Sequence, residues 1–441
     1  MEENYYHIYF EELNMKIVVY FNFIISVLFT ICYFYQFVYV IIGLLKKPRS
    51  MEAKTQHKYA VVVSARNEAN MIGNLIDSIK NQNYPSELID TLVVADNCTD
   101  NTAEVARLHG AHVFERFNDH LIGKGYALDW LFKKVKETMP DNNYEAYIIF
   151  DADNIVDPNF ISEMNKAFDN GYRIITSYRN SKNYGENWIS AGYSLWFLRE
   201  AKFLNNSRMK LGTSCAISGT GFLVSSEIID KNNGWIHHLL TEDIEFTTDN
   251  VIQGEIIGYC ENAVLYDEQP VTFYQSYIQR LRWSKGFYQV FAKYGGKLFA
   301  GMLKGSFSCY DMLMTISPAM LLTLASTVIN LIAIVFGFIG DPEHLPMLFK
   351  ALGQTLFGFY SMFFFLGVVT TITEHKQIRC STLKMIGYTF TFPLFMLTYV
   401  PISVIALFKK VKWEPIKHSV AMSVYDICQA DEIDVSESLN T

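Results

Sequence analysis

Residues 147–153 read YIIFDAD, an apolar run of four residues followed at once by two aspartates that one alanine separates. A short apolar run bounded by polar residues predicts a buried β-strand. Because side chains alternate along extended backbone, Asp151 and Asp153 are expected to face one site while Ala152 points away. Carboxylate oxygens suit a divalent metal, but an isolated Asp-x-Asp is also typical of an acidic turn or a helix N-cap. The rest of the sequence is needed to choose between a metal site and these structural roles.

The sequence before this run alternates between strand-like and helix-like segments. Residues 59–64 (YAVVVS) are rich in β-branched residues, and apolar residues follow at helical spacing over about 68–81. Further strands are predicted at 90–95, 112–114 and 147–150, and further helices from Thr102 and over 124–138. This alternation predicts an α/β fold with a parallel sheet, helices on both faces, and ligands beyond the carboxyl ends of the strands.

Two common nucleotide-binding motifs are missing from this pattern. The first strand is followed by Ala65–Glu68 (ARNE) instead of a glycine-rich dinucleotide-binding turn, and Gly123–Gly125 (GKG) is not a P-loop. The strand ends carry acidic residues instead, with Asp96 after the second strand and Asp151 and Asp153 after the fourth. The predicted site is therefore acidic, and it suits a ligand that binds through a metal.

A second acidic motif, Thr241-Glu242-Asp243, lies downstream. Thr241 is a candidate N-cap, and the two acids would complement the dipole of the helix that begins there. The same place suits a general base, because a carboxylate displayed at a helix start is well oriented to take a proton from an attacking hydroxyl. We assign that role to Asp243, and the two interpretations are compatible.

A third motif, Gln279-Arg280-Leu281-Arg282-Trp283, precedes the apolar C-terminal part of the chain. On a helix Gln279 and Arg282 share a face, and arginine presents a planar fork of donors that suits phosphate oxygens. The tryptophan and its basic neighbours also fit an amphipathic helix at a membrane surface, with Trp283 among the headgroups. One helix can satisfy both descriptions.

Apolar segments of membrane length flank the polar middle region. With 50% hydrophobic and 19% charged residues, the 441-residue chain is too apolar for an ordinary soluble protein. Segments that reach the roughly 20 residues needed to cross a bilayer are 16–45, 312–340, 351–373 and 383–408. Lys46, Lys47 and Arg49 follow the first of them, so the positive-inside rule places the middle region in the cytoplasm.

The predicted spans and the charge rule disagree at the C-terminal end. One early span and three late spans would place the basic stretch Lys409–Lys412 outside, against the positive-inside rule. Either one late segment does not cross, the proline-bearing 383–408 being the weakest, or another segment dips into the membrane.

Charge and cysteine content give two further indications. A net charge of −8 argues against a nucleic-acid surface, and seven scattered cysteines without a C-x-x-C pair indicate reduced thiols.

The order of these motifs, Asp-x-Asp, Glu-Asp and Gln-x-x-Arg-Trp before membrane segments, resembles the processive members of glycosyltransferase family 2. That group contains the cellulose, chitin, poly-N-acetylglucosamine and hyaluronan synthases. The resemblance covers residues 58–310 as motifs and the flanking spans as architecture. It implies a Rossmann-like glycosyltransferase A domain inserted between transmembrane helices. The implied divisions are an N-terminal transmembrane segment at 1–49, a cytosolic glycosyltransferase A domain at 50–270, interfacial helices at 271–310, C-terminal transmembrane helices at 311–408 and a cytoplasmic tail at 409–441.

The resemblance also implies roles for individual residues. Asp243 would be the general base of an inverting transfer, and Asp151 and Asp153 would hold Mg²⁺ or Mn²⁺ against the diphosphate leaving group. The residues implied to bind the donor are Ala65, Arg66, Glu68, Asp96, Lys124, Asp151, Gln279 and Arg282. The residues implied to bind the acceptor are Trp283, Glu242, Gly219 and Thr220.

The expected function is polymerisation of a UDP-hexose, with UDP-glucose favoured, into a β-linked glucan, cellulose-like or of mixed linkage, that is extruded across the membrane. One alternative is a chitin or poly-N-acetylglucosamine type of synthase that uses UDP-N-acetylglucosamine. A second is a non-processive lipid glycosyltransferase, similar to ceramide glucosyltransferase. A transporter or scaffold is the rival outside enzymes, but the spans nearly lack the charges that transporters use.

The expected partners are a UDP-sugar donor, a growing glycan acceptor and the lipid bilayer, with no nucleic acid. The expected location is the plasma membrane, crossed several times, with the glycosyltransferase domain in the cytoplasm. The tail at 409–441 is too short for the cyclic-di-GMP receptor domain that bacterial cellulose synthases often carry. Any regulation is therefore expected from an accessory export or regulatory subunit.

Overall fold

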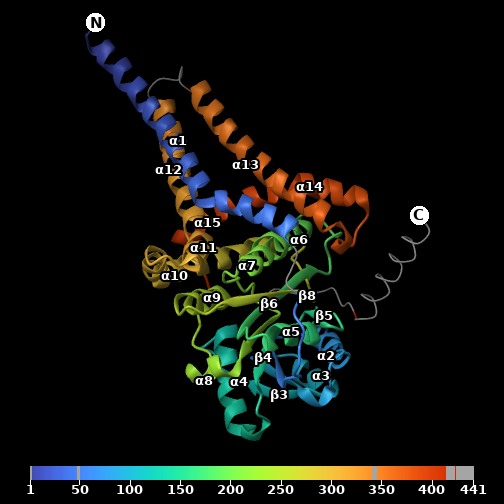
Figure 1. Ribbon diagram of the computed structural model, residues 1–441. Coiled ribbons are helices and arrows are strands. Elements are labelled where there is room, and N and C mark those ends of the chain that lie inside the picture. Colours follow the sequence, from blue (N-terminus) through green and yellow to red (C-terminus); the bar gives the residue numbers. More distant parts are fainter. Residues whose placement is uncertain (1, 47–49, 340–344, 414–422, 424–441) are drawn as a thin grey trace, which may run out of the picture.

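A computed structural model of the chain describes residues 2–46, 50–339, 345–413 and 423 (Figure 1). An α/β domain forms one end of the molecule, and the long helices α1, α12 and α13 extend away from it. Of the predicted basic clusters, Lys47 and Arg49 lie outside the described residues, as does the tail beyond Trp413 apart from Ser423.

The α/β domain contains an eight-stranded mixed sheet of order β3-β2-β1-β4-β7-β6-β8-β5. The strands are β1 (Tyr59–Ala65), β2 (Ile89–Asp96), β3 (His112–Arg116), β4 (Ala146–Asp151), β5 (Ile155–Val156), β6 (Ile174–Ser181), β7 (Phe222–Ser225) and β8 (Ile257–Asp267). The four predicted strands are confirmed as parallel neighbours β1 to β4. The prediction of a wholly parallel sheet is wrong, because β7 pairs antiparallel with β4 and β6, and β5 pairs antiparallel with β8.

Helices cover both faces of the sheet and continue toward the long C-terminal helices. They are α2 (Ile72–Lys80), α3 (Thr102–Leu108), α4 (Lys124–Thr138), α5 (Phe160–Asp169), α6 (Trp188–Arg199), a π-helical turn η3 (Glu200–Asn205), α7 (Asn206–Leu211), α8 (Ser226–Lys231), α9 (Glu242–Ile252), α10 (Phe273–Leu303) and α11 (Phe307–Ile316). Short 3₁₀ turns lie at Ser86–Leu88, Pro140–Asn142 and His375–Gln377.

The central strands are apolar on both faces because both faces are covered. In β1, Val61 and Val63 pack in one core cluster with residues of α2 and α5. Ala60 and Val62, which alternate with them, pack in a second cluster with residues of α4 and α6. The result is a three-layer domain in which the parallel strands β1, β2 and β4 end at one edge of the sheet.

The remaining helices form the apolar end of the molecule. They are α1 (Glu2–Leu45), α12 (Pro318–Ile339), α13 (Leu345–Thr373), α14 (Thr382–Leu397) and α15 (Tyr399–Phe408). By length and composition, three described segments can cross a membrane: Lys16–Leu45, Leu352–Thr373 and Thr382–Phe408. The predicted span at 312–340 begins too early, because residues 307–316 form the separate helix α11, and its described apolar part is the shorter Leu324–Val335.

A buried ion pair attaches α1 to the α/β domain. The Arg208 guanidinium of α7 donates to both carboxylate oxygens of Asp311 in α11, at 2.7 and 2.8 Å. The hydroxyls of Tyr35 and Tyr39 in α1 donate to the same carboxylate, at 2.8 and 2.7 Å. Because a buried charge requires partners on every side, this network fixes the C-terminal part of α1 against the domain.

The segment 382–408 lies along the α/β domain at both of its ends. Near its start, the Lys384 ammonium donates to the carbonyl of Gly185 at 3.0 Å. Near its end, the Lys285 ammonium of α10 donates to the carbonyl of Leu407 at 3.2 Å. Of its apolar window, 39% is buried inside the protein, against 6% and 11% for the other two candidate spans. The segment 382–408 is therefore a candidate span that also packs in part on the α/β domain.

We predict that the α/β domain and residues 409–413 lie together on the cytoplasmic side, because α15 returns the chain to the domain and the stretch is basic. In a variant whose seven cysteines are replaced by serine, Lys412→Cys should resist an impermeant thiol reagent in intact cells and react after permeabilisation. Glu343→Cys, between α12 and α13, is the control and should react in intact cells. Strong labelling at position 412 in intact cells would contradict the prediction.

Candidate active site

One pocket at the carboxyl edge of the sheet brings the three sequence motifs together. Residues of β1, β2, β4, α4, α9 and α10 reach it, and its lining extends along the chain from Ser64 to Trp413. The predicted site residues that line it are Arg66, Glu68, Asp96, Lys124, Asp151, Asp153, Gly219, Glu242, Asp243, Gln279, Arg282 and Trp283. Their roles in binding and catalysis remain predictions.

Two predicted contact residues do not line the pocket. Ala65 is the last residue of β1, and the alternation of the strand turns its side chain into the apolar core. Thr220 is buried, and its hydroxyl accepts a hydrogen bond from the Asp151 amide at 2.9 Å. Thr220 therefore supports the loop that carries the acid pair instead of contacting an acceptor directly.

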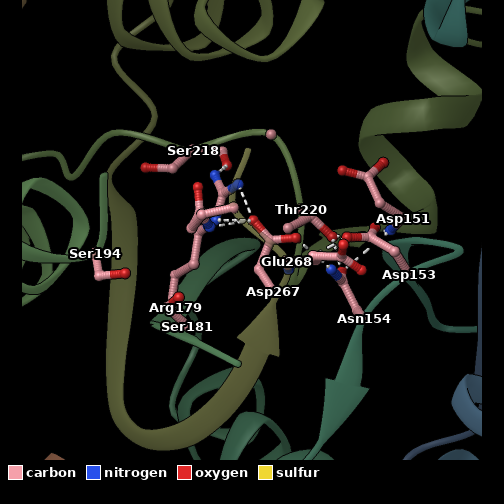
Figure 2. A network of polar contacts seen from close by, with 12 residues as sticks. Asp151, Asp153, Asn154, Arg179, Ser181, Ser194, Ser218, Thr220, Asp267 and Glu268 are labelled. Atoms are coloured by element: carbon pink, nitrogen blue, oxygen red, sulfur yellow. Dashed lines mark hydrogen bonds and ion pairs between the residues drawn. The ribbon is translucent and has the colours of Figure 1, made fainter. Parts of the chain in front are cut away.

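The Asp-x-Asp motif follows β4, and both carboxylates reach the pocket (Figure 2). The Lys124 ammonium of α4 donates to the Asp151 carboxylate and, at 2.7 Å, to the carbonyl of Gly219. The Asp153 carboxylate accepts a hydrogen bond from the Glu268 amide at 3.3 Å. Ala152, between the two acids, is buried in the apolar core cluster that contains Val61 and Val63, although it also borders the pocket.

The acid pair fits a divalent metal that completes its coordination with substrate. Within the described residues, no group of three or more histidine, cysteine, aspartate or glutamate side chains is placed to hold a metal on its own. Mg²⁺ is commonly bound by one or two carboxylates together with water and substrate phosphates. Asp151 and Asp153 supply that number of carboxylates at the pocket wall.

The second acidic motif begins α9, as the sequence predicts. Thr241 is the N-cap residue, but its side chain makes no capping hydrogen bond, and it packs instead against Gly286 of α10. Glu242 and Asp243 occupy the first turn and face the pocket. Burial raises the pKa of Glu242, and the neighbouring Asp243 charge raises it further, while Lys124 lowers it. Burial likewise raises the pKa of Asp243.

A glycine turn lies beside the candidate base. Gly219 adopts φ +84°, a conformation that glycine accommodates without strain. A Cβ at this position would lie 3.5 Å from the Asp243 Oδ2 atom. The absence of a side chain thus leaves the space next to the carboxylate open for a reacting hydroxyl.

Helix α10 presents the third motif to the pocket, and it has two unsatisfied polar atoms there. Gln279 and Arg282 both line the pocket, as their spacing on one helix face predicts. The Gln279 Oε1 and Arg282 Nε atoms are buried, and within the described part of the chain neither has a hydrogen-bond partner. Buried polar groups are normally paired, so these atoms indicate a place that a polar ligand fills.

Aromatic rings form the wall next to these groups. Trp283 lies edge-on to Tyr193, with ring centroids 5.7 Å apart, and to Phe197, at 6.1 Å. These contacts fix the indole while one side of it remains on the pocket. A fixed aromatic face suits a sugar ring, which offers C–H groups on its flat sides.

Several pocket residues were not identified from the sequence, among them Arg179, Trp196, Glu200 and Trp413. Arg179 on β6 donates to the Asp267 carboxylate at 2.9 Å through Nε, and its guanidinium lies 3.8 Å from the centre of the Phe197 ring. Trp196 on α6 and Glu200, which begins the π-helical turn, also line the pocket. Trp413 follows α15, and the Arg66 guanidinium lies 5.3 Å from the centre of its ring. None of these four residues belongs to a local motif.

Asp96 lines the pocket but already has a partner. Its carboxylate accepts from the Arg116 guanidinium of β3, and both side chains are nearly fully buried. Burial raises the pKa of Asp96, although Arg116 opposes this effect. The pair holds the carboxylate rigidly at the end of β2, where a donor base or ribose is expected.

The mixed sheet, the acid pair after β4 and the pocket at the strand ends define the class of domain. It is a glycosyltransferase A-like α/β domain. A solved mannosyltransferase from Pyrobaculum calidifontis, in complex with GDP-mannose and Mn²⁺, has this fold. The two superpose with a TM-score of 0.57 at 16% identity, over 88% of this chain and 99% of that one.

Residues 57–286 match the family described as glycosyltransferase like family 2, and the chain belongs to glycosyltransferase family 2. Beta-monoglucosyldiacylglycerol synthase of Nostoc is 24% identical over 61% of this chain and 57% of its own length. Poly-beta-1,6-N-acetyl-D-glucosamine synthase of Staphylococcus epidermidis is 22% identical over 55% and 58%. The probable glycosyltransferase YdaM of Bacillus subtilis is 23% identical over 55% and 58%. The chain thus spans less than two thirds of these relatives.

We predict that Asp243→Asn lowers the rate of UDP release from a UDP-sugar by roughly 10²–10⁴-fold, the loss expected for a missing general base. UDP affinity should change little, because Asp243 is assigned to the acceptor hydroxyl and not to the diphosphate. Asp249→Asn, on the same helix but outside the pocket, is the matched control. Near-normal turnover in Asp243→Asn would remove this residue from the base role.

We predict that activity falls on acidification at a higher pH than an ordinary carboxylate would give, because burial raises the pKa values of both acids and only the ionised base accepts a proton. Glu242→Gln removes the adjacent negative charge and should lower the pKa of Asp243. The acid limb of the pH profile of kcat/KM should therefore move to lower pH in this variant. A limb that stays in place or moves upward would show that the two acids are not coupled.

Proposed function

We propose that the protein transfers a hexose from a UDP-sugar, with UDP-glucose favoured, to a growing β-linked glucan by an inverting reaction. The observation that carries this proposal is the arrangement on α10. Two polar atoms, the Gln279 Oε1 and the Arg282 Nε, have no hydrogen-bond partner among the described residues. Gln279, Arg282 and the neighbouring Trp283 all line the pocket of the candidate base. One helix therefore presents groups for a diphosphate and a platform for a sugar side by side.

In this mechanism the chain orients two substrates around one carboxylate. Asp151 and Asp153 would hold the divalent metal, which neutralises charge on the departing diphosphate when it is bound. Gln279 and Arg282 would bind the same diphosphate through the atoms that have no partner in the protein. Asp243 would take the proton from the acceptor hydroxyl as that oxygen attacks the anomeric carbon. Attack from the side opposite the leaving group inverts the configuration.

The electrostatics of the pocket support this division of roles. Lys124 lies between Asp151 and the Gly219 carbonyl, and its charge lowers the pKa of Glu242 and of Asp243. Burial opposes the charge of Lys124, but the surrounding carboxylates raise its pKa overall. A cation held in this position can stabilise an ionised base and also approach the donor phosphates.

A lipid glycosyltransferase is the second candidate, and two observations favour it. One relative that the chain resembles is named beta-monoglucosyldiacylglycerol synthase. In addition, 382–408 lies along the α/β domain, which leaves α1, α12 and α13 as the described helices directed away from it. A bundle of three membrane helices from one chain would be small for enclosing a polymer. A polymer synthase of this size would then need a second copy or an accessory subunit to complete the export path.

We predict that membranes containing the protein release UDP from UDP-glucose in the presence of Mg²⁺ or Mn²⁺ and form a high-mass product that β-glucan-specific glycanases digest. Trp283→Ala should reduce polymer formation far more than UDP affinity, because the indole is assigned to the acceptor. Arg282→Ala should weaken UDP binding, because the guanidinium is assigned to the diphosphate. Product size after incubation with radiolabelled UDP-glucose is the measurement.

Three outcomes separate the candidates. Only a monoglycosylated, organic-extractable lipid would replace the polymer synthase by the lipid glycosyltransferase. Activity with UDP-N-acetylglucosamine but not with UDP-glucose would change the assigned donor. UDP release that persists in excess chelator would exclude the metal role of Asp151 and Asp153.

A further inference from the structure

Arg280 lies within the third motif but points away from the pocket. Its side chain is completely buried, and no described carboxylate forms an ion pair with it. The guanidinium carbon lies 4.6 Å from the ring centre of Phe395 and 4.9 Å from that of Tyr399, with Tyr193 at 6.0 Å. A charge taken out of water and held without an anion is costly unless other groups replace its hydration. The aromatic faces supply part of that replacement.

Besides a hydrogen bond within α10, from its Nε atom to the Ser276 carbonyl, Arg280 donates to the break between α14 and α15. Its Nη1 atom donates to the Thr398 hydroxyl at 2.5 Å and to the Phe395 carbonyl at 3.3 Å. The break falls at Thr398 because Pro401, three residues on, cannot donate to the carbonyl of the preceding turn. The Phe395 carbonyl, in the last turn of α14, also accepts from the Thr398 N–H and the Thr398 hydroxyl, and a cation near a helix C-terminus is favourable. Arg280 thus caps α14 from α10.

Helix α15 then leads from this break back to the donor side of the pocket. Its Ile402 and Ala406 pack against Leu281 of α10 in a small core cluster, which Val411 also contacts. Two residues later Trp413 lines the pocket and lies over Arg66. The position of Trp413 therefore depends on how α15 packs against α10. Along the chain, that packing begins where Arg280 contacts the α14–α15 break.

We propose that Arg280 is a positioning residue that sets Trp413 against the donor site by fixing the α14–α15 break on α10. The proposal rests on the proposed function only in taking the pocket to bind a nucleoside diphosphate. Arg280 itself touches no substrate. It acts through the backbone of α15, and its neighbours Gln279 and Arg282 contact the ligand from the same helix. The motif thus connects ligand binding to the C-terminal segment through one buried side chain.

A double-mutant cycle on UDP binding tests the proposal without reference to acceptor or product. The purified full chain is titrated with UDP and Mg²⁺ for Arg280→Met, Trp413→Ala and the double variant. Trp413→Ala should lower the affinity roughly fivefold or more, the lower end of what an aromatic contact to a base contributes. Arg280→Met should lower it to a similar degree. The double variant should be no weaker than the weaker single variant, because both changes remove one contact.

Further variants keep the outcome decisive. Thr398→Val removes one acceptor of Arg280 and should show the same coupling to Trp413→Ala with a smaller loss. It replaces Arg280→Met in the cycle if that variant does not fold. Arg280→Lys should not restore affinity, because an ammonium lacks the planar fork. Lys297→Met, exposed on the same helix, is the control. Additive losses, or Arg280→Met with unchanged UDP affinity, would overturn the proposal. No UDP binding by the unaltered protein would overturn the proposed function as well.

Discussion

An excess of negative charge in one pocket is the constraint on which the arrangement of this molecule depends. Within the described part of the chain, nine carboxylates and four cationic side chains line it. The carboxylates are Glu68, Asp96, Asp151, Asp153, Glu200, Glu242, Asp243, Asp267 and Glu268, and the cations are Arg66, Lys124, Arg179 and Arg282. Negative charges close together in a partly dry site raise the pKa values of neighbouring carboxyl groups, and the charge of Asp243 has this effect on Glu242. A bound divalent cation would reduce the repulsion among these carboxylates, whereas an anionic ligand that binds without a metal would increase it.

The fold meets this constraint by bringing positive groups from several directions. Lys124 comes from the start of α4, Arg179 from the middle of the sheet, and Arg282 from α10, which lies between the sheet and the apolar helices. Each cation has a specific task within the protein: Lys124 contacts Asp151, and Arg179 is paired with Asp267. Among these three cations, and within the residues that the structure describes, only Arg282 has a buried donor atom without a partner. It is therefore the cation that is best prepared for an incoming phosphate.

The sequence predicted the features that depend on local patterns. The strands β1 to β4, the acids at their ends, the helix that begins after Thr241 and the helix face shared by Gln279 and Arg282 all follow from periodicity within a few residues. The antiparallel strand β7 did not, because its pairing with β4 and β6 joins segments far apart in the chain. Arg179, Trp196, Glu200 and Trp413 were missed for the same reason. They reach the pocket only through tertiary packing.

Hydropathy was least informative where an apolar segment packs in part on protein. Residues 383–408 have the length and composition of a span, yet they contain Pro401 after the break and face a buried arginine from another helix. An apolar helix that meets such a cation has to lie against the domain that supplies it. The sequence contains both the apolar segment and the arginine, but neither has a local pattern that predicts their contact.

The two sides of the pocket are formed by different elements. Asp96 ends β2 and Arg66 follows β1, so both belong to the side that the sheet forms. Trp196 belongs to α6, which contacts both α13 and α14. On that helix Arg199 also donates to Gln36 of α1 at 2.6 Å. The aromatic residues Trp196 and Phe197 therefore lie on the helix that joins the pocket to the apolar helices. Under the proposed function, the nucleotide would bind on the sheet side and the acceptor beside α6, whether the acceptor is a polymer or a lipid. The chemistry of the pocket is compatible with a polymer product and with a glycosylated lipid. The space between α6 and the apolar helices would determine which of the two acceptors fits.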